Sequence, residues 1–534
     1  METASPTAVA EPCVSDDQRL LHRLGYAQEL ARRMGAFRNF AVSFSIISIL
    51  AGCLPSYFLA FHWGGPVSVT WGWLIVGLFT TFVALSMAEI ASTYPTAGGL
   101  YYWSSKLGGP TWGWFTGWFN VLGLLGVGAV GYGLATFAAS LLGLLWGYPT
   151  DRHHIFYLFV GAMAAAMFAN VFEVRVTSIL SAISVYWHLI GVAVIVVALA
   201  VVPEHHQSAG YVFTQTVNNS GFAGDGWGSA TFFMVFAIGS IGMAQYTLVG
   251  YDASAHMAEE THRASRSAAV GMVMAVVVSV IAGFVLLLAL TFAIPSPTGV
   301  QSHFGDIVAY IWSNALSTRW AEALLLIVIF AQFFCLVACI TASSRLLFAF
   351  SRDRAVPGHR LWRKVSRHRV PVPAVFAVGA ASFLILVPTW WNNLAGYYAA
   401  TSIGATSLYI AYVQPVILRL RQGSSFEKGA WSLGRHYRWI NPIAIGWVAV
   451  ISVVFMLPTN PGGMPWRKGF DLNSVNYAPV TIGMAFLLFG GWYAVSARKW
   501  FEGPVSMGTE DELEHFEAAQ AEQFVGEPAP DLSG

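Results

Sequence analysis

Charged residues are scarce in this chain: Asp, Glu, Lys and Arg make up only 10% of its 534 residues. A soluble globular domain typically contains about 25% charged residues, whereas 56% of this sequence is hydrophobic. The shortage of charge excludes an ordinary soluble domain and predicts an integral membrane protein surrounded by a lipid bilayer. With 28 basic and 27 acidic residues, the net charge is near zero and indicates no nucleic-acid partner.

Cysteine is also scarce, with four residues in the chain. Cys335 and Cys339 are spaced to share one face of a helix, which we interpret as packing rather than as a metal or redox site. We therefore expect no metal and no cofactor. A membrane enzyme would need a nucleophile with a base or a metal cluster at depth, and the apolar runs contain a single central histidine without an acidic partner. We expect that the protein is not an enzyme.

Long stretches without charge are what the sequence has instead. Two of these stretches are each long enough to contain two membrane spans, so the sequence predicts twelve spans in all. Each is near the length of about 20 residues that crosses a bilayer. The spans lie within residues 38–502. If both termini are cytoplasmic, only four of the 28 basic residues lie on the extracellular side of the membrane. Membrane proteins show this excess of Lys and Arg on the cytoplasmic side. Since no signal peptide precedes the first span, the cell membrane is the expected location.

The two tails differ in composition. Residues 1–37 form an N-terminal tail in which leucine, alanine and arginine alternate at helical spacing over 17–34, which predicts an amphipathic helix at the membrane surface. Residues 503–534 contain acidic residues but no Lys or Arg. We expect this C-terminal tail to be solvated and disordered.

Small residues interrupt the first and the sixth predicted spans. The first carries Ser48 and Gly52 near its middle, and the sixth carries Gly242 and Gly250 before Asp252. Backbone that is freed at membrane depth must face protein or a water-filled cavity, because lipid forms no hydrogen bonds. The two breaks are five helices apart, which predicts two inverted repeats and a binding site where the breaks meet, as in secondary transporters. The alternative is that the small residues only permit close helix packing.

Several stretches resemble one family of transporters. They are LGYAQELARRMGAFRNFAVSFSIISILAG (24–52), AEIASTYPTAGGLYYWSSKLGGP (88–110), GYDASAHMAEETHRASRSA (250–268), SRLLFAFSRDRAVPG (344–358) and NYAPV (476–480). In these motifs the chain is similar to the amino acid, polyamine and organocation transporter superfamily, and more narrowly to its amino acid/choline permease branch. The resemblance implies an all-α, leucine-transporter-type fold with ten core helices in two inverted five-helix repeats and two peripheral helices. It also implies transport of amino acids, 4-aminobutyrate, choline or polyamines, driven by protons or by exchange.

The spans lack Lys and Arg at mid-depth, which favours recognition of a small zwitterion by backbone groups, because isolated charges are costly there. Amides at the first break would receive the carboxylate, and carbonyls at the second would receive the ammonium. The predicted substrate site consists of Ser48, Ile49, Gly52, Tyr246, Thr247, Gly250 and Tyr251. By resemblance, Tyr246 stands where an aromatic residue commonly gates the substrate; core packing is the alternative.

The sequence leaves the coupling ion open between a proton and Na⁺. His188 lies centrally in the fifth span and can change charge near neutral pH; by resemblance, a basic group on this helix stands where sodium-coupled relatives hold the ion. A structural histidine is the alternative. Asp252 can carry a proton or serve as a structural cap or hub. Ser343 and Ser344 lie where sodium-coupled members use hydroxyl ligands, although hydroxyls also bond within their own helix.

Three acidic residues, Glu89, Glu259 and Glu260, are predicted at cytoplasmic helix ends. The basic residues expected nearby are Lys106, Arg263 and Arg266. Salt bridges among these residues would close an inner gate, and simple solvation at the interface is the alternative.

The substrate class has alternatives as well. Choline would need aromatic faces around its quaternary ammonium, and polyamines would need several carboxylates, of which only Asp252 lies near the breaks. A transporter-like nutrient sensor would bind substrate without moving it. A channel would show a polar stripe or a charged ring, and the sequence shows neither.

Overall fold

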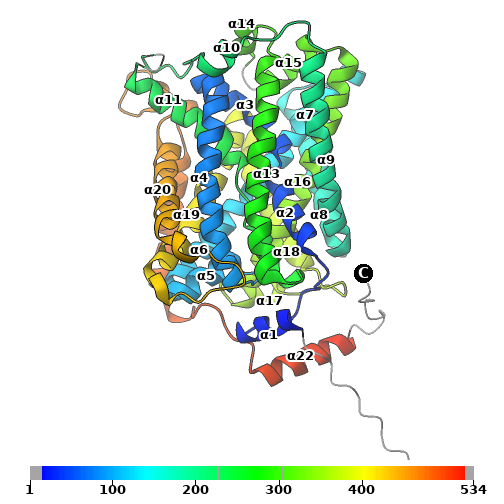
Figure 1. Ribbon diagram of the computed structural model, residues 1–534, viewed down its shortest axis with the longest axis vertical. Coiled ribbons are helices and arrows are strands. Elements are labelled where there is room, and N and C mark those ends of the chain that lie inside the picture. Colours follow the sequence, from blue (N-terminus) through cyan, green and yellow to red (C-terminus); the bar gives the residue numbers. More distant parts are fainter. Residues whose placement is uncertain are drawn as a thin grey trace, which may run out of the picture.

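The chain folds into a bundle of helices. The computed structural model describes residues 15–523, except 173, 225, 227, 304, 305 and 392, and the only β-pairing among these residues is an isolated bridge between Met34 and Thr261. Eleven helical segments in this part of the chain are long and apolar enough to cross a membrane. They lie side by side in Figure 1. The protein is therefore a multi-pass membrane protein.

The crossing segments follow the predicted spans. They are α2 (Ala36–Ile47) with α3 (Ile49–Gly64), α4 (Pro66–Thr93), α6 (Pro110–Leu124) with η1 (Leu125–Val127) and α7 (Gly128–Trp146), α8 (Arg152–Val171), α9 (Val174–Val201), α13 (Ala264–Phe292), α16 (Thr318–Arg352), α18 (Val372–Leu386) with η4 (Val387–Trp390), α19 (Asn393–Gln422) with η5 (Gly423–Ser425), η6 (Gly434–His436) with α20 (Tyr437–Met456), and α21 (Ala478–Val495) with η9 (Ala497–Lys499). The predicted sixth span is the exception: α11 (Ala230–Ser240) and the π-helical turn η2 (Ile241–Gln245) form a shorter apolar segment.

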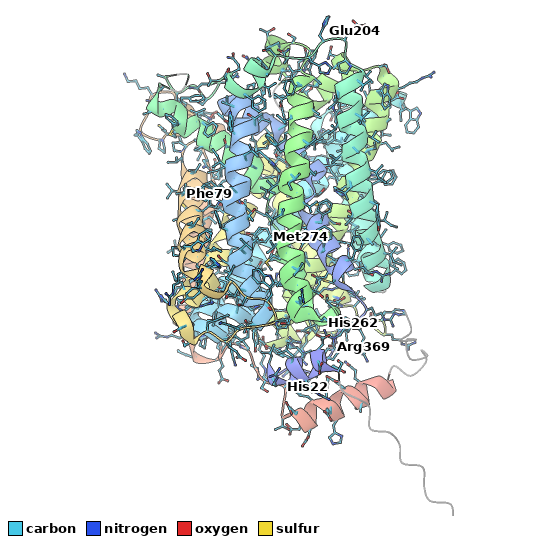
Figure 2. All side chains as sticks on the ribbon, viewed as in Figure 1. His22, Phe79, Glu204, His262, Met274 and Arg369 are labelled. Atoms are coloured by element: carbon cyan, nitrogen blue, oxygen red, sulfur yellow. The ribbon has the colours of Figure 1, made fainter. Side chains whose placement is uncertain are left out.

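Short helices cover the two ends of the bundle. Those between the crossing segments are α5 (Gly99–Gly108), α10 (Ala209–Thr214), α12 (Ala253–His256), η3 (Ala258–Glu260), α14 (Pro297–Ser302), α15 (Ile307–Ala315), α17 (His359–Trp362), η7 (Pro461–Gly463) and η8 (Leu472–Ser474). Figure 1 shows α10, α14 and α15 at one end, and α17 at the other, where both tails lie. Figure 2 places Glu204 at the first end and His22, His262 and Arg369 at the end with the tails.

Burial distinguishes central from peripheral helices. The most apolar part of the segment 36–64 is 89% buried inside the protein, whereas that of 478–499 is only 22% buried. Apolar side chains that point outward from a membrane helix face lipid, so a low buried share marks a peripheral helix. The first span therefore lies at the centre of the bundle and the last one at its edge.

The N-terminal tail is helical over a shorter range than the sequence predicts. The expected helix over 17–34 is confined to α1 (Asp16–Arg23), which starts with a capping box between Ser15 and Gln18. The helix ends because Gly25 adopts a left-handed φ of 94°. Residues 24–35, which follow, form no helix.

The prediction of a disordered C-terminal tail is wrong for the part of it that the structure describes. Helix α22 (Glu510–Gln523) packs against α1, and the carboxylate of Glu517 lies 2.8 Å from Nε2 of His22 and accepts a hydrogen bond from the Gln28 amide at 2.5 Å. Thr509 and Glu512 exchange hydrogen bonds as a capping box at the start of the helix. This local start signal outweighs the acidic composition. Residues 524–534 lie outside the described part of the chain, as do residues 1–14.

Both tails meet at Asp353, directly after α16. Its carboxylate accepts hydrogen bonds from the Tyr26 hydroxyl at 2.8 Å and from the Val505 amide at 3.1 Å. Burial raises the pKa of Asp353 from its ordinary value of 3.8 to about 6, although the neighbouring Arg352 opposes this shift. The folded chain thus binds this proton more tightly than the unfolded chain does.

We expect this shift to make stability depend on pH. Because the folded-state pKa is raised, the contribution of Asp353 is fully present below about pH 4 and is lost as the pH rises through about 6. Asp353→Asn has no carboxyl proton to lose and should not show this loss of stability. The Tm of the variant minus that of the wild type should therefore be about 1–3 °C higher at neutral pH than at acidic pH. Thermal unfolding of both proteins in detergent measures this difference. The exposed Asp306→Asn is the control, and a pH slope in Asp353→Asn equal to that of the wild type would contradict the prediction.

Candidate functional site

The first membrane segment is broken at a single residue. Ser48 has φ 32° and ψ 82°, in the left-handed region, and separates α2 from α3. A non-glycine residue in this region costs about 1–2 kcal/mol, and such strain is typical of functional sites. The Ser48 hydroxyl accepts a hydrogen bond from the Ala51 amide at 3.2 Å. Among the described residues, the amides of Ile49 and Leu50 have no partner, so the start of α3 offers free donors.

The second break follows η2. Gly250 has a left-handed φ of 82°, and its amide donates to the Tyr412 hydroxyl at 3.0 Å instead of to a helix carbonyl. The carbonyl of Leu248 accepts from the Tyr409 hydroxyl at 2.7 Å. In the described part of the chain, the carbonyls of Thr247 and Val249 accept no hydrogen bond. The second break therefore offers free acceptors.

The two breaks touch each other through their glycines. A Cβ on Gly52 would lie 2.5 Å from Cγ2 of Thr247, and a Cβ on Gly250 would lie 2.2 Å from Cγ2 of Ile46. Real Cβ atoms do not approach other atoms this closely, so only glycine permits the contact. The small residues thus serve both predicted purposes, since they allow close packing and they lie at the breaks.

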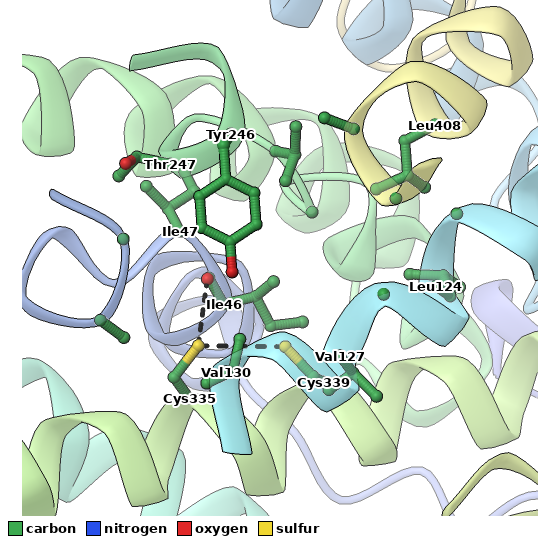
Figure 3. Close-up of a pocket in the computed structure, with 18 of the residues that line it drawn as sticks. Ile46, Ile47, Leu124, Val127, Val130, Tyr246, Thr247, Cys335, Cys339 and Leu408 are labelled. Carbon is green, nitrogen blue, oxygen red and sulfur yellow. Dashed lines mark hydrogen bonds between the residues drawn. The ribbon is translucent and has the colours of Figure 1, made fainter. Parts of the chain in front are cut away.

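A small cavity lies beside this contact. It is lined by Gly52, Tyr246, Thr247 and Gly250 of the predicted site, and no charged side chain lines it. Figure 3 shows the Tyr246 ring reaching into the cavity toward Ile46 and Cys335. The volume of the cavity is about 60 Å³.

Three residues of the predicted site lie beside the cavity rather than on its wall. Ser48 and Ile49 form the first break itself. Tyr251 is buried below the second break, where its ring centroid lies 5.1 Å from that of Tyr412.

The rest of the cavity wall was not predicted from the sequence. Gly126 and Gly404 pack backbone to backbone, since a Cβ on Gly126 would lie 3.0 Å from the Gly404 Cα. Both glycines line the cavity, together with Cys335 and Cys339, which the sequence assigned to helix packing alone. The available signal was the pair of glycines inside the third and tenth predicted spans. Their partnership is visible only once the helices are assembled.

His188 holds the first break in place. Its Nε2 lies 2.6 Å from the Ser48 hydroxyl, and its Nδ1 lies 2.7 Å from the Ser184 carbonyl. A neutral ring that carries its hydrogen on Nδ1 satisfies both contacts, because Ser48 can donate to Nε2. These contacts are those of a structural histidine. Its role as proton carrier stays a prediction.

The hydroxyl groups on α16 are occupied within their own helix. The Ser343 hydroxyl donates to the Cys339 carbonyl at 2.7 Å, and the Ser344 hydroxyl donates to the Thr341 carbonyl at 2.8 Å. This is the alternative that the sequence left open for them. A sodium-binding role for Ser343 and Ser344 also stays a prediction.

Three buried ion pairs lie toward the end of the bundle that carries the tails. They are Glu89–Arg419, Glu259–Arg352 and Glu260–Arg345, each with an N–O distance of 2.8 Å. The predicted partners Lys106, Arg263 and Arg266 were wrong. The arginines come from the ends of α16 and α19, which are distant in sequence and close only in the folded chain. All three pairs exclude water, so simple solvation does not describe these acidic residues.

A multi-pass helical bundle with two broken helices beside a small cavity is the architecture of a membrane permease. The amino acid permease family matches residues 35–486, and the chain belongs to this family. It is 36% identical to the amino-acid permease BAT1 homolog of Oryza sativa subsp. japonica, over 91% of this chain and 95% of the relative. It is 35% identical to amino-acid permease BAT1 of Arabidopsis thaliana, over 93% and 97%. The GABA-specific permease of Saccharomyces cerevisiae is 28% identical, over 93% and 87%.

We expect Gly250→Ala to weaken amino acid binding by roughly tenfold or more, or about 1.4 kcal/mol. The added Cβ would lie 2.2 Å from Cγ2 of Ile46, and the alanine would have to adopt the left-handed φ of 82°. The two breaks must therefore move apart. Equilibrium binding of a radiolabelled amino acid to the purified protein measures the effect. The control is Gly242→Ala in the same segment, whose Cβ would make an ordinary contact of 3.6 Å with Leu59. Equal affinities of the two variants would count against the site.

We expect Glu89→Gln to lower the free energy of unfolding by about 3–5 kcal/mol, because it leaves the Arg419 guanidinium buried without a countercharge. Thermal and chemical unfolding in detergent measure this loss. Glu204→Gln at the opposite end, where the side chain is exposed, serves as the control. A change below about 1 kcal/mol, the range of exposed pairs, would show that the pair is solvated rather than buried.

Proposed function

We propose that this amino acid permease is a secondary active transporter that moves a small zwitterion, an amino acid or 4-aminobutyrate, across the cell membrane by alternating access. The observation that carries the proposal is the cavity between the two breaks. Free amides lie at the start of α3 beside the cavity, free carbonyls belong to residues of its wall, and no charged side chain lines it. This arrangement suits a ligand that brings one carboxylate and one ammonium group.

The proposed architecture has twelve spans, with α11 and η2 as a short sixth one. We infer that the first ten form two inverted five-helix repeats and that α20 and α21 are peripheral. The low buried share of both helices, 33% and 22%, supports this assignment. Both termini are proposed to be cytoplasmic, because most basic residues then face the cytoplasm.

The coupling is proposed to use protons or exchange of one substrate for another. His188 and Asp252 are the titratable candidates, and Ser343 and Ser344 remain the candidates if Na⁺ is the ion. Glu89 is proposed to close the inner gate through its buried pair with Arg419.

Other substrates have weaker support. A relative from Candida albicans with 27% identity is named a putative polyamine transporter, yet a polyamine would need carboxylates and the cavity wall carries none. Choline would need several aromatic faces, and Tyr246 is the single aromatic residue on the wall. A sensor that binds without transport is distinguished by the experiment that follows.

The purified protein in liposomes should take up a small zwitterion, and an inward proton gradient should stimulate this uptake several-fold. A panel of radiolabelled neutral amino acids, 4-aminobutyrate, arginine, choline and putrescine tests the substrate class. Preferred uptake of putrescine or choline would contradict the proposal. Measurable binding without uptake or exchange would identify a sensor instead.

A further inference from the structure

A buried pair of titratable side chains lies just beyond the second break. Oδ2 of Asp252 lies 3.1 Å from Nε2 of His256, one turn later on α12. The side chains are 1% and 0% exposed. The Asp252 side chain does not cap α12, so its contacts are those of a pair and not of a helix cap. His256 was not singled out in the sequence.

The partners of His256 fix where its hydrogens must be. Nδ1 lies 2.9 Å from the Ala97 carbonyl, which can only accept a hydrogen bond. Nδ1 therefore carries a hydrogen. Nε2 faces a carboxylate oxygen, and two acceptors at hydrogen-bond distance need a hydrogen between them. The pair thus holds one proton more than a neutral imidazole and a free carboxylate would hold together.

Hydrogen bonds connect this pair to the cavity. The Tyr412 hydroxyl donates to Oδ1 of Asp252 at 2.6 Å and accepts from the Gly250 amide at 3.0 Å. Gly250 lines the cavity. A continuous chain therefore runs from the cavity wall through Tyr412 to the Asp252–His256 pair.

The same pair is connected to the end of the bundle that carries the tails. His256 holds the carbonyl of Ala97, in the loop between α4 and α5, and the Ala97 amide donates to Glu259 at 3.0 Å. Glu259 in turn forms its buried ion pair with Arg352. The start of α5 packs tightly on the imidazole, since a Cβ on Gly99 would lie 2.9 Å from Cε1 of His256.

We propose that the Asp252–His256 pair is the site that binds the transported proton. This inference rests on the proposed function of a proton-coupled permease. One proton binds to the pair from one side of the membrane and leaves to the other, and only an N–H or O–H bond forms and breaks. Without the proton, the imidazole keeps a single hydrogen, so one of its nitrogens faces an acceptor with a lone pair, either the Asp252 carboxylate or the Ala97 carbonyl. Their repulsion releases Ala97 and loosens the contacts around the Glu259–Arg352 pair.

The surroundings contain few competing groups. Three tyrosines, Tyr251, Tyr409 and Tyr412, are the titratable side chains that interact with Asp252. The side-chain nitrogen of Asn120, on α6, lies 3.4 Å from Nε2 of His256. The helices packed on α12 bring Ser43 from α2, which bonds to Ser254, and Gly271 from α13.

The charges nearest to this region are already paired. Arg345 of α16 binds Glu260, and Arg352 binds Glu259. Among the groups around α12, the Asp252–His256 contact is the one that places a ring nitrogen against a carboxylate oxygen.

Two transport assays on the full chain in liposomes test the proposal. The probe is radiolabelled 4-aminobutyrate, or alanine if the wild type does not take up 4-aminobutyrate. We expect Asp252→Asn and His256→Gln to lose gradient-driven uptake by roughly tenfold or more, while exchange at equal pH stays within about threefold of the wild type. A site that cannot bind or release the proton can still exchange substrate. The matched control is Asp306→Asn, which alters an exposed Asp–His pair with a separation of 3.6 Å.

A milder variant covers the case in which these proteins do not fold. Tyr412→Phe keeps both members of the pair but removes a donor to the carboxylate, which weakens the charged form. The midpoint of the pH dependence of uptake should move to higher pH. An unchanged midpoint would overturn the proposal.

Other results would also overturn it. One is gradient-driven uptake that survives Asp252→Asn or His256→Gln. Another is loss of both uptake and exchange in a monodisperse variant, which would assign the pair to structure alone. If the wild type transports neither probe, the failure lies in the proposed function, and it is seen before any variant is made.

Discussion

The inability of lipid to form hydrogen bonds is the constraint on which the rest of this structure depends. Every backbone group that leaves a helix at membrane depth must find a partner inside the protein. The two breaks meet this requirement by lying against each other at the centre of the bundle, through contacts that only Gly52 and Gly250 permit. The interruption of each helix is therefore tolerated because the other helix covers it.

Side chains from other helices replace the missing helix bonds. His188 of α9 fixes Ser48, and Ser43 of α2 binds the Tyr251 carbonyl at 2.7 Å. Tyr409 and Tyr412 of α19 bind the second break. These partners satisfy some of the freed groups and leave others open. The open groups are the ones available to a ligand, so the pattern of satisfied bonds delimits the proposed binding site as much as the cavity does.

Much of this fold could be predicted from the sequence, because charge-free runs and helix-breaking residues are local signals. Eleven predicted spans correspond to long apolar helices, and both breaks lie at the predicted residues. The partners of Glu89 and His256 could not be predicted, since the arginine and the loop carbonyl lie far away in sequence. Helix α22 was missed for another reason: composition was given more weight than the local capping box at Thr509.

The three ion pairs have a consequence for the balance between conformations. While they are closed, six charges are kept from water, and their mutual attraction offsets only part of the lost hydration. When water enters this end of the bundle, hydration returns as the pairs separate. In the proposed alternating-access cycle, opening would exchange the attraction within the pairs for hydration of similar size, so an ion pair that is strong in the closed state need not hold the protein closed. A difference of a few kcal/mol, within reach of a small ligand, is then enough to select either conformation.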